Sequence, residues 1–290
     1  PLVTRALRAS ANTGVPIETW AVEKNPNAYV VLQRHNEEDW GHVVNIVKSD
    51  MRAWKGPLRM QTAIVGQDNI PVATYGKVDI LVSELLGSFA DNELSPECLD
   101  GVQHVLAPGR GISIPSSYTA HLTPILAPRL HADISHRAIN DSTVLDTPYV
   151  VMLHAIDYAA ISVPDYPRFQ QAWEFVHPIS PSILAISEAR RGGGVSGGGG
   201  GSMAGGDGAN EHNARFARLN FVCKDRGVVN GIAGYFEAVL FGGKDGNLVE
   251  LSTRPDTIDE KSKDMISWFP IYFPLKVNIA PIRTGNIGGE

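Results

Sequence analysis

The sequence contains few cysteines, and their spacing matches no known framework. Cys98 and Cys223 are the only two in 290 residues, and they lie far apart in the chain. A disulfide-stabilised secreted domain or a structural zinc site needs more cysteines at short spacings. We therefore expect two buried free thiols in a reducing compartment, with a single bridge between them as the alternative.

Long hydrophobic runs and an excess of positive charge are also missing. The most apolar stretch, residues 149–164, is broken by His154 and Asp157 and is shorter than the ~18 apolar residues of a membrane span. Asp and Glu outnumber Lys and Arg by 31 to 25, for a net charge of −6, so we expect no membrane and no direct nucleic-acid partner. The chain starts at Pro1 without a signal peptide, and we interpret it as an excised piece.

The composition is globular, with 43% hydrophobic and 19% charged residues, and the first half alternates helix and strand patterns. This alternation with short links is typical of an open doubly wound α/β sheet, which we assign to residues 1–112. Residues 56–76, punctuated by Gly and Pro, are expected to form a surface loop. In chain order the patterns predict a helix from Pro1 to Gly14, a strand at 17–22, a helix starting at Asn25-Pro26, strands at 42–47 and 78–83, and a helix from Ser95 to Val105.

After Gly111 the pattern changes to β-branched and aromatic segments separated by turns, which is typical of an antiparallel barrel or sandwich. We assign residues 113–290 to this second domain. Residues 190–213 interrupt it with a Gly-rich insertion that cannot bury enough apolar area to become ordered, so we expect it to be flexible. The predicted strands are ISIP (112–115), SSYTAHLTPI (116–125), YVVMLHAI (149–156), AWEFVH (172–177), RFARLNFVC (215–223), VVNGIAGYFEAVLF (228–241), NLVELS (247–252) and PLKVNIAPI (274–282).

Two acidic residues follow predicted strands of the first domain. Glu23 stands where an open α/β sheet places an acid to bind the ribose of a nucleotide cofactor, and the usual glycine-rich turn would precede it by about 20 residues, before Pro1. Asp50 follows the next strand and could accept from an adenine amino group. The alternatives are an exposed strand-end glutamate and a turn-forming aspartate.

The most informative segment is VSELLGSFADNE, residues 82–93. Glu84 directly follows a strand, and Glu93 returns nine residues later. Two carboxylates that converge in a pocket repel each other unless a cation lies between them, and a planar guanidinium is the natural occupant. The alternatives are a divalent metal site and a plain acidic turn. The metal site is the weaker of the two, because no third carboxylate or histidine lies at a suitable spacing to complete the coordination.

Longer strings around these residues resemble one family. SELLGSFADNELSPECLDG (83–101) is similar to the double-glutamate loop and following helix of type II protein arginine methyltransferases, the protein arginine methyltransferase 5 group. Together with the following strings, it covers most of the chain outside residues 56–76 and 190–213. The others match the group in the same order: AVEKNPNA (21–28), SDMRAW (49–54), GYFEAVL (234–240) and SWFPIYFP (267–274).

The resemblance implies a Rossmann-like S-adenosylmethionine domain followed by a β-barrel, and a protein arginine as methyl acceptor. By position, Glu23 would bind the ribose, and Asp50 and the Met51 amide would bind the adenine. Glu84 and Glu93 would form the catalytic clamp on the arginine. Trp268 corresponds to the aromatic wall on the arginine. Relatives that form the asymmetric product carry Thr-His-Trp where this chain has Ile266-Ser267-Trp268, which favours the symmetric product and places Ser267 beside the substrate.

The resemblance also implies partners and a location. These are arginine- and glycine-containing substrates such as histones and RNA-binding proteins, a WD-repeat partner, a homo-oligomer, a role in chromatin regulation, and the cytoplasm and nucleus. The family's glycine-rich cofactor loop and first sheet strand would lie before Pro1, and its last barrel strands after Glu290, so we expect this piece to be inactive alone. A non-catalytic scaffold remains the main alternative, and a nicotinamide oxidoreductase would leave residues 82–93 unexplained.

Overall fold

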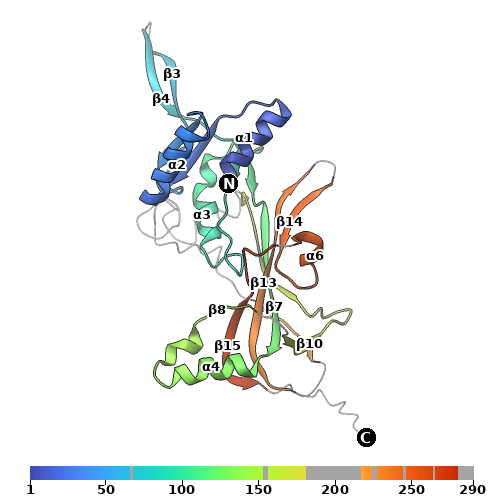
Figure 1. Ribbon diagram of the computed structural model, residues 1–290. Helices are drawn as coiled ribbons and strands as arrows, with labels where there is room; N and C mark the ends of the chain where they lie inside the picture. Colours follow the sequence, from blue (N-terminus) through green and yellow to red (C-terminus); the bar gives the residue numbers. More distant parts are fainter. Residues whose placement is uncertain are drawn as a thin grey trace. The chain divides into compact units, whose positions relative to one another are not determined.

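The computed structural model divides into two compact units (Figure 1). Unit 1 holds residues 1–83, 96–114 and 177–180, and unit 2 holds 84–95, 115–176 and the described residues after 216. The Gly-rich segment 190–213 lies outside the described residues. Those described are 1–65, 68–152, 156–180, 217–223, 227–243, 246–263 and 265–279.

Unit 1 begins with two helices whose ends follow the sequence signals. Helix α1 (Leu2–Thr13) ends at Gly14, which adopts the left-handed conformation at φ 69° that glycine takes without strain. Helix α2 (Pro26–Glu38) starts after Asn25, whose side chain accepts from two amides of the first turn at 2.9 and 3.4 Å. Both predicted boundaries are confirmed.

The strands of unit 1 form two separate parallel pairs among the described residues. β1 (Thr19–Glu23) pairs with β2 (Val44–Lys48), and β5 (Ile80–Val82) pairs with β6 (Ile112–Ile114). Assigning ISIP to the antiparallel domain was therefore wrong: its backbone bonds are with β5, which the β-branched composition alone cannot reveal. α3 (Ser95–Val102) forms as predicted and tightens into the 3₁₀ turn η1 (Gln103–Val105).

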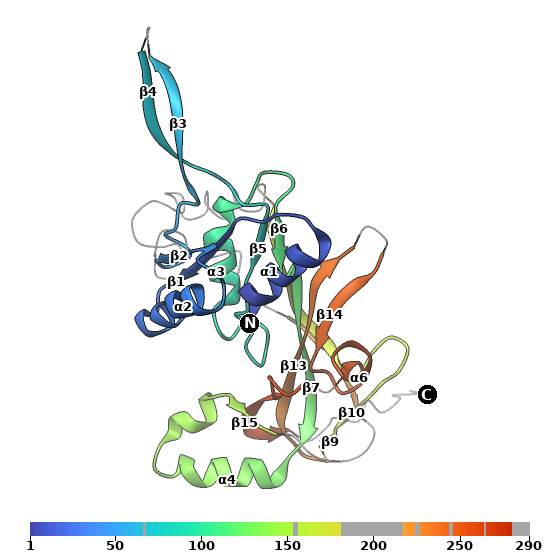
Figure 2. The same ribbon diagram turned by 45° about the horizontal axis from the view of Figure 1, so that its top comes forward.

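The predicted loop at 56–76 is instead a β-hairpin, which extends away from α2 and the β1–β2 pair (Figure 2). β3 (Leu58–Val65) pairs with β4 (Asp68–Tyr75) along its whole length. Pro71 lies inside β4, opposite Thr62, and at the base of the hairpin Gly76 N donates to Pro57 O at 2.7 Å. Gly56 has φ 104°, and a Cβ there would lie 2.4 Å from Gly76 O, so the base requires glycine.

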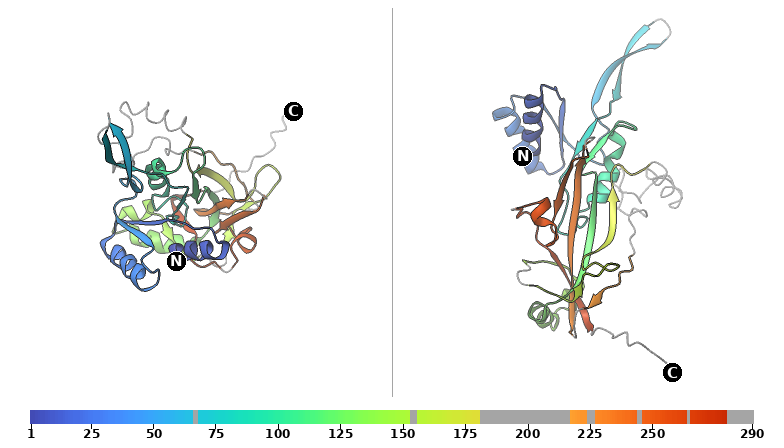
Figure 3. Two further views of the ribbon diagram at one scale, coloured as in Figure 1. Left: turned by 90° about the horizontal axis from the view of Figure 1, so that it is seen from above. Right: turned by 90° about the vertical axis from the view of Figure 1, so that its right-hand side faces the viewer.

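Unit 2 is built on an antiparallel sheet of seven strands with the order β11-β7-β13-β15-β8, to which β14 and β9 add by pairing with β13 and β7. Figure 3 shows the green β7 and the orange β13 side by side. The predicted antiparallel domain is confirmed, but β11 and β8 do not pair, so the described residues form an open sheet rather than a closed barrel. The seven strands are β7 (Ser117–Leu126), β8 (Tyr149–Val150), β9 (Asp157–Tyr158), β11 (Gln170–Val176), β13 (Val229–Gly242), β14 (Leu248–Ser252) and β15 (Ile271–Ile279). A separate antiparallel pair is formed by β10 (Ala160–Ile161) and β12 (Val222–Cys223).

Helical segments of unit 2 were not predicted. Helix α4 (Pro128–Ala138) starts at a proline and buries Ile134, and the 3₁₀ helix η2 (Ser142–Asp146) and the short helix α6 (Ile258–Lys261) join strands. Of the strand predicted at 149–156, residues 153–155 lie outside the described residues, and among the others Tyr149 and Val150 form β8. Short amphipathic segments between strands carry too few apolar residues to signal a helix.

Aromatic side chains form the core of unit 2. Tyr235 and Tyr272 are fully buried, and Phe169 meets Tyr235 edge to face at 5.4 Å. A Cβ on Gly231 would lie 2.2 Å from the Tyr272 ring, so this close strand pairing requires glycine.

The predictions for the two cysteines and for membrane spans can be compared with the described residues. Cys98 and Cys223 are free, as predicted, but half-buried rather than buried, and burial raises the pKa of the Cys98 thiol. None of the described helices is long and apolar enough to cross a membrane.

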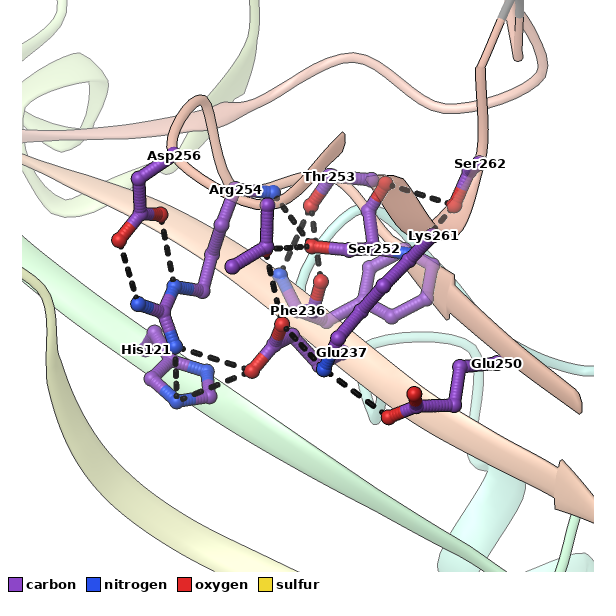
Figure 4. Close-up of polar contacts among 11 residues, drawn as sticks. His121, Phe236, Glu237, Glu250, Ser252, Thr253, Arg254, Asp256, Lys261 and Ser262 are labelled. Atoms are coloured by element: carbon purple, nitrogen blue, oxygen red, sulfur yellow. Dashed lines mark hydrogen bonds and ion pairs between the residues drawn. The ribbon is translucent and has the colours of Figure 1, made fainter. Parts of the chain in front are cut away.

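A buried polar network crosses the sheet of unit 2 (Figure 4). The Arg254 guanidinium donates to Glu237 at 2.9 Å and to Asp256 at 2.7 and 3.1 Å, and it lies 3.2 Å from His121 Nε2. Burial, together with the Arg254 charge, lowers the pKa of His121 to about 4, although Glu237 and Asp256 act in the opposite direction. His121 is therefore neutral at pH 7 and accepts from Arg254.

This network predicts a loss of stability in weak acid. The unfolded chain binds the His121 proton near the ordinary pKa of 6.5 and the folded chain only near 4, so between these values stability rises with pH. Urea unfolding should give a lower free energy at about pH 5 than at about pH 7, with a His121 contribution on the order of 1 kcal/mol.

His121→Gln keeps an acceptor but gains no proton, so its stability should vary less with pH. The matched control is His136→Gln, on an exposed position of α4, which should keep the wild-type dependence. Equal pH dependence for all three proteins would contradict the role of His121.

Candidate active site

An acidic loop, residues 84–95, is anchored in unit 2 by one aromatic side chain. Phe89 is 5% exposed and meets Trp173 and Phe273 edge to face at 5.4 and 5.2 Å. A Cβ on Gly234 of β13 would lie 2.8 Å from the Phe89 ring. The Phe89 ring thus fixes the loop in an aromatic pocket, and the ring fits there only because residue 234 is a glycine.

The turn inside the loop is tightly specified. Asn92 Oδ1 accepts from Phe89 N at 2.7 Å, and a Cβ on Gly87 would lie 2.3 Å from that oxygen. Ala90 and Leu94 both have positive φ, at 67° and 64°, a conformation that strains non-glycine residues. Strain of this kind persists only where surrounding contacts hold it, and it is often found at functional sites.

The charge of Glu93 acts on Glu84 within the loop. Partial burial raises the pKa of Glu84, and the charge of Glu93 adds to this rise, while a bond from Leu86 N at 3.2 Å opposes it. Both residues are exposed overall. The convergence of Glu84 and Glu93 on one cation stays a prediction, and the effect of the Glu93 charge on Glu84 is in the direction that it requires.

Trp268 lies at the same loop. Its Nε1 donates to Leu86 O at 2.6 Å, and its half-buried ring meets Phe236 edge to face at 5.5 Å and 90°. The indole, 182 residues from Leu86 in sequence, is thus positioned beside the segment between the two glutamates. Ser267 is exposed. Two carboxylates and an aromatic ring together can hold a planar cation.

Glu23 ends β1 and Asp50 follows β2 by two residues, so both lie at the carboxyl edge of this parallel pair in unit 1. Glu23 is opposite Lys48 in the register, and its Oε1 accepts from Asn25 N at 2.7 Å. Lys24, the next residue, lies 3.6 Å from Asp50. The carboxylate of Glu23 keeps capacity for further donors, since each of its oxygens has two lone pairs, and it fits a ribose diol.

Asp50 is more strongly engaged than the sequence suggested. Arg52 donates to both of its carboxyl oxygens, at 3.0 and 2.9 Å, and again through its backbone amide at 2.9 Å. The side-chain hydrogen bond from Arg52 lowers the pKa of Asp50 to about 2, although burial opposes this shift. Met51 follows in the same turn and is half-buried. The adenine contacts of Asp50 and Met51 stay predictions.

Sequence reasoning missed the residues that hold the site in place. Phe89, Phe236 and the Leu86 carbonyl have supporting roles that depend on partners far along the chain, so no local spacing identifies them. Among the described residues, no cluster of three His, Cys, Asp or Glu side chains is suited to a metal ion.

Comparisons with known proteins give the family. A model described as "PRMT5 arginine-N-methyltransferase" matches residues 1–114, and one described as "PRMT5 oligomerisation domain" matches residues 117–286. Protein arginine N-methyltransferase skb1 of Schizosaccharomyces pombe is 41% identical over 95% of this chain, and protein arginine N-methyltransferase 5 of Xenopus laevis is 36% identical over 99%. The chain spans only 36% of the length of each of these relatives.

Solved structures share the fold at low identity. The Trypanosoma brucei PRMT1 enzyme-prozyme heterotetrameric complex with AdoHcy matches with a TM-score of 0.61 and 11% identity, over 93% of this chain and 69% of that one. Arabidopsis thaliana protein arginine methyltransferase 10 matches with a TM-score of 0.53 and 13% identity, over 91% of this chain and 69% of that one. The two family models, one of which covers more than half of the sequence, together show that the chain belongs to the PRMT5 family of arginine methyltransferases.

Proposed function

We propose that the full-length protein transfers a methyl group from S-adenosylmethionine to a guanidinium nitrogen of arginine in protein substrates. The observation that carries this proposal is the acidic loop, in which the charge of Glu93 raises the pKa of Glu84 while the Trp268 indole donates to the carbonyl of Leu86 between them. Membership of the PRMT5 family supports the same chemistry.

The two glutamates would act on the charge of the arginine. A guanidinium is a poor nucleophile because its lone pairs are delocalised and it stays protonated. Carboxylates of Glu84 and Glu93 bonded to two of its nitrogens hold positive charge on their side and leave the third nitrogen richer in electrons. Trp268 would pack against the guanidinium and restrict its orientation, so that most of the acceleration comes from positioning and fixed electrostatics. Glu84, whose pKa is raised, or a water beside it would take the released proton.

The cofactor would bind at the carboxyl edge of the β1–β2 pair. S-adenosylmethionine supplies an electrophilic methyl group when bound. Glu23 would accept from its ribose hydroxyls, and Asp50 and the Met51 amide would bind the adenine. The family match and the AdoHcy in the Trypanosoma brucei complex support this cofactor.

Product, partners and location follow from the family resemblance. We propose symmetric dimethylation, because Ile266 and Ser267 stand where asymmetric enzymes carry Thr and His, and Ser267 lies beside Trp268 in the sequence. The oligomerisation domain matched at residues 117–286 supports an oligomer, and we propose that its copies are identical. A WD-repeat partner, histone and RNA-binding protein substrates, a role in chromatin regulation, and the cytoplasm and nucleus complete the proposal.

The clamp predicts a large loss of turnover. In the full-length protein, Glu84→Gln or Glu93→Gln should reduce kcat at least ~100-fold, because each removes a charge that stabilises the transition state. Binding of S-adenosylmethionine should change little. Methyl transfer to a Gly-Arg peptide, followed by mass spectrometry, measures the effect and identifies the product.

The control for the clamp is Glu174→Gln, the same change at an exposed position of β11 in unit 2, which should leave kcat unaltered. Activity within a few-fold of wild type for either clamp variant would refute the assignment.

The proposed role of Glu23 at the ribose predicts a change in cofactor binding. Glu23→Ala should weaken S-adenosylmethionine binding by about 1.5–3 kcal/mol, because charge-assisted hydrogen bonds to the ribose are lost. Calorimetry on the full-length protein measures this, with Glu38→Ala at the exposed end of α2 as the control. An unchanged affinity would remove Glu23 from the cofactor site.

A further inference from the structure

The segment that carries Trp268 is held by a carboxylate outside the acidic loop. Residues 252–268 connect β14 to the aromatic wall, and Glu237 on β13 binds three side chains of this segment (Figure 4). Glu237 Oε2 accepts from Arg254 at 2.9 Å, and Oε1 accepts from Thr257 at 2.8 Å and from Lys261 at 3.0 Å. One side chain thus fixes three points along the segment.

The Glu237 carboxylate is both buried and ionised. Its side chain is 14% exposed, and burial opposes its charge, but the bonds from Lys261 and Thr257 and the charge of Arg254 outweigh this and lower the pKa of Glu237. A buried ionic network is weak evidence for stability, because apolar residues of similar volume often stabilise a fold as well or better. The positions of the three donors along residues 252–268, rather than the energy of the network, suggest that Glu237 has a role in positioning this segment.

The neighbouring residue on β13 connects the network to the site. Phe236 N donates to the Thr253 side-chain oxygen Oγ1 at 2.8 Å, and Thr253 N donates to Phe236 O at 2.9 Å. The Phe236 ring in turn meets Trp268 edge to face. Two consecutive residues of β13 therefore hold both the start of the segment and the indole at its end.

The far end of the segment is closed as well. Ser262 Oγ accepts from Ser252 N at 2.6 Å and donates to Ser252 O at 3.1 Å, and Met265 N donates to Ser262 O at 3.0 Å. These bonds hold Ser262 against the end of β14 and Met265 against Ser262. Trp268 then completes the path with its bond to Leu86 O.

We propose that Glu237 is a positioning residue for methyl transfer, which fixes residues 252–268 so that the Trp268 indole stays at the acidic loop. The inference rests on the proposed function for its catalytic consequence. Its structural part, that Glu237 controls the position of Trp268, holds independently of activity.

The structural part is tested by fluorine NMR of this chain labelled with 5-fluorotryptophan. The chain has five tryptophans, and Trp268→Phe identifies the signal of interest. Glu237→Gln, which removes the charge at nearly equal size, should shift or broaden the Trp268 signal and leave that of Trp40 in unit 1 unchanged. Lys261→Met, a milder change that removes one donor, should produce a smaller shift in the same signal.

The matched control is Glu250→Gln. Glu250 on β14 binds Lys261 at 2.9 Å, and its replacement leaves the bonds of Glu237 with Arg254 and Thr257 in place, so the Trp268 signal should stay where it is. An unchanged Trp268 signal in folded Glu237→Gln and Lys261→Met would overturn the inference, whatever the activity.

The catalytic part is tested in the full-length protein by a double-mutant cycle. Glu237→Gln should reduce kcat/KM for an arginine peptide by ~10-fold or more, since small misplacements of substrate-orienting groups reduce rates strongly. The Kd for S-adenosylmethionine should stay within roughly twofold, and the loss should shrink in a Trp268→Phe background because both changes act on one path.

The outcomes separate the two proposals. A wild-type protein without arginine methyltransferase activity, together with a displaced Trp268 signal, would refute the proposed function and keep the structural part of the inference. An active wild type with additive losses in the cycle would refute the inference and keep the function.

Discussion

The burial of Phe89 is the interaction on which the candidate catalytic arrangement depends. Its ring fills a pocket formed by Trp173 and Phe273, and it lies in the middle of a loop that carries two carboxylates at its ends. Each buried aromatic ring contributes on the order of 2–3 kcal/mol of transfer free energy. That gain offsets the strain at Ala90 and Leu94 and the repulsion between Glu84 and Glu93, and without it the loop would have no reason to keep this shape.

The site therefore combines unfavourable elements with a rigid support. Like charges approach each other, non-glycine residues adopt positive φ, and a carboxylate is buried at Glu237. Local conflicts of this kind are expected where function, rather than stability, determines the residues. The supporting parts are apolar and tightly packed, as the contact of Gly234 with the Phe89 ring illustrates.

Local signals in the sequence predicted the parts of the fold that local physics controls. The Asn25 cap, the Gly14 helix end and the apolar strand before Glu84 are decided by residues within a few positions, and the structure confirms them. The pairing of β6 with β5 and the openness of the sheet depend on long-range hydrogen bonds, which no short pattern encodes. The resemblance gave Trp268 as the aromatic wall on the arginine but not its bond to Leu86, 182 residues away in sequence. Glu237 escaped notice because its partners lie 17 to 24 residues along the chain.

The hairpin of β3 and β4 enters and leaves unit 1 through a neck where Gly56 lies so close to the Gly76 carbonyl that a Cβ would not fit between them. Just beyond the neck, Arg59 of β3 holds the base of the hairpin to the rest of the unit, because its guanidinium pairs with Glu18 and lies over the Trp20 ring. The parts of β3 and β4 farther out extend away from α2 and the β1–β2 pair (Figure 2). Pairs of facing residues could be added to or removed from β3 and β4 together, while the distance between Gly56 and Gly76 stays the same. The tip of the hairpin is thus a place where a foreign sequence can be inserted with little strain on the remainder.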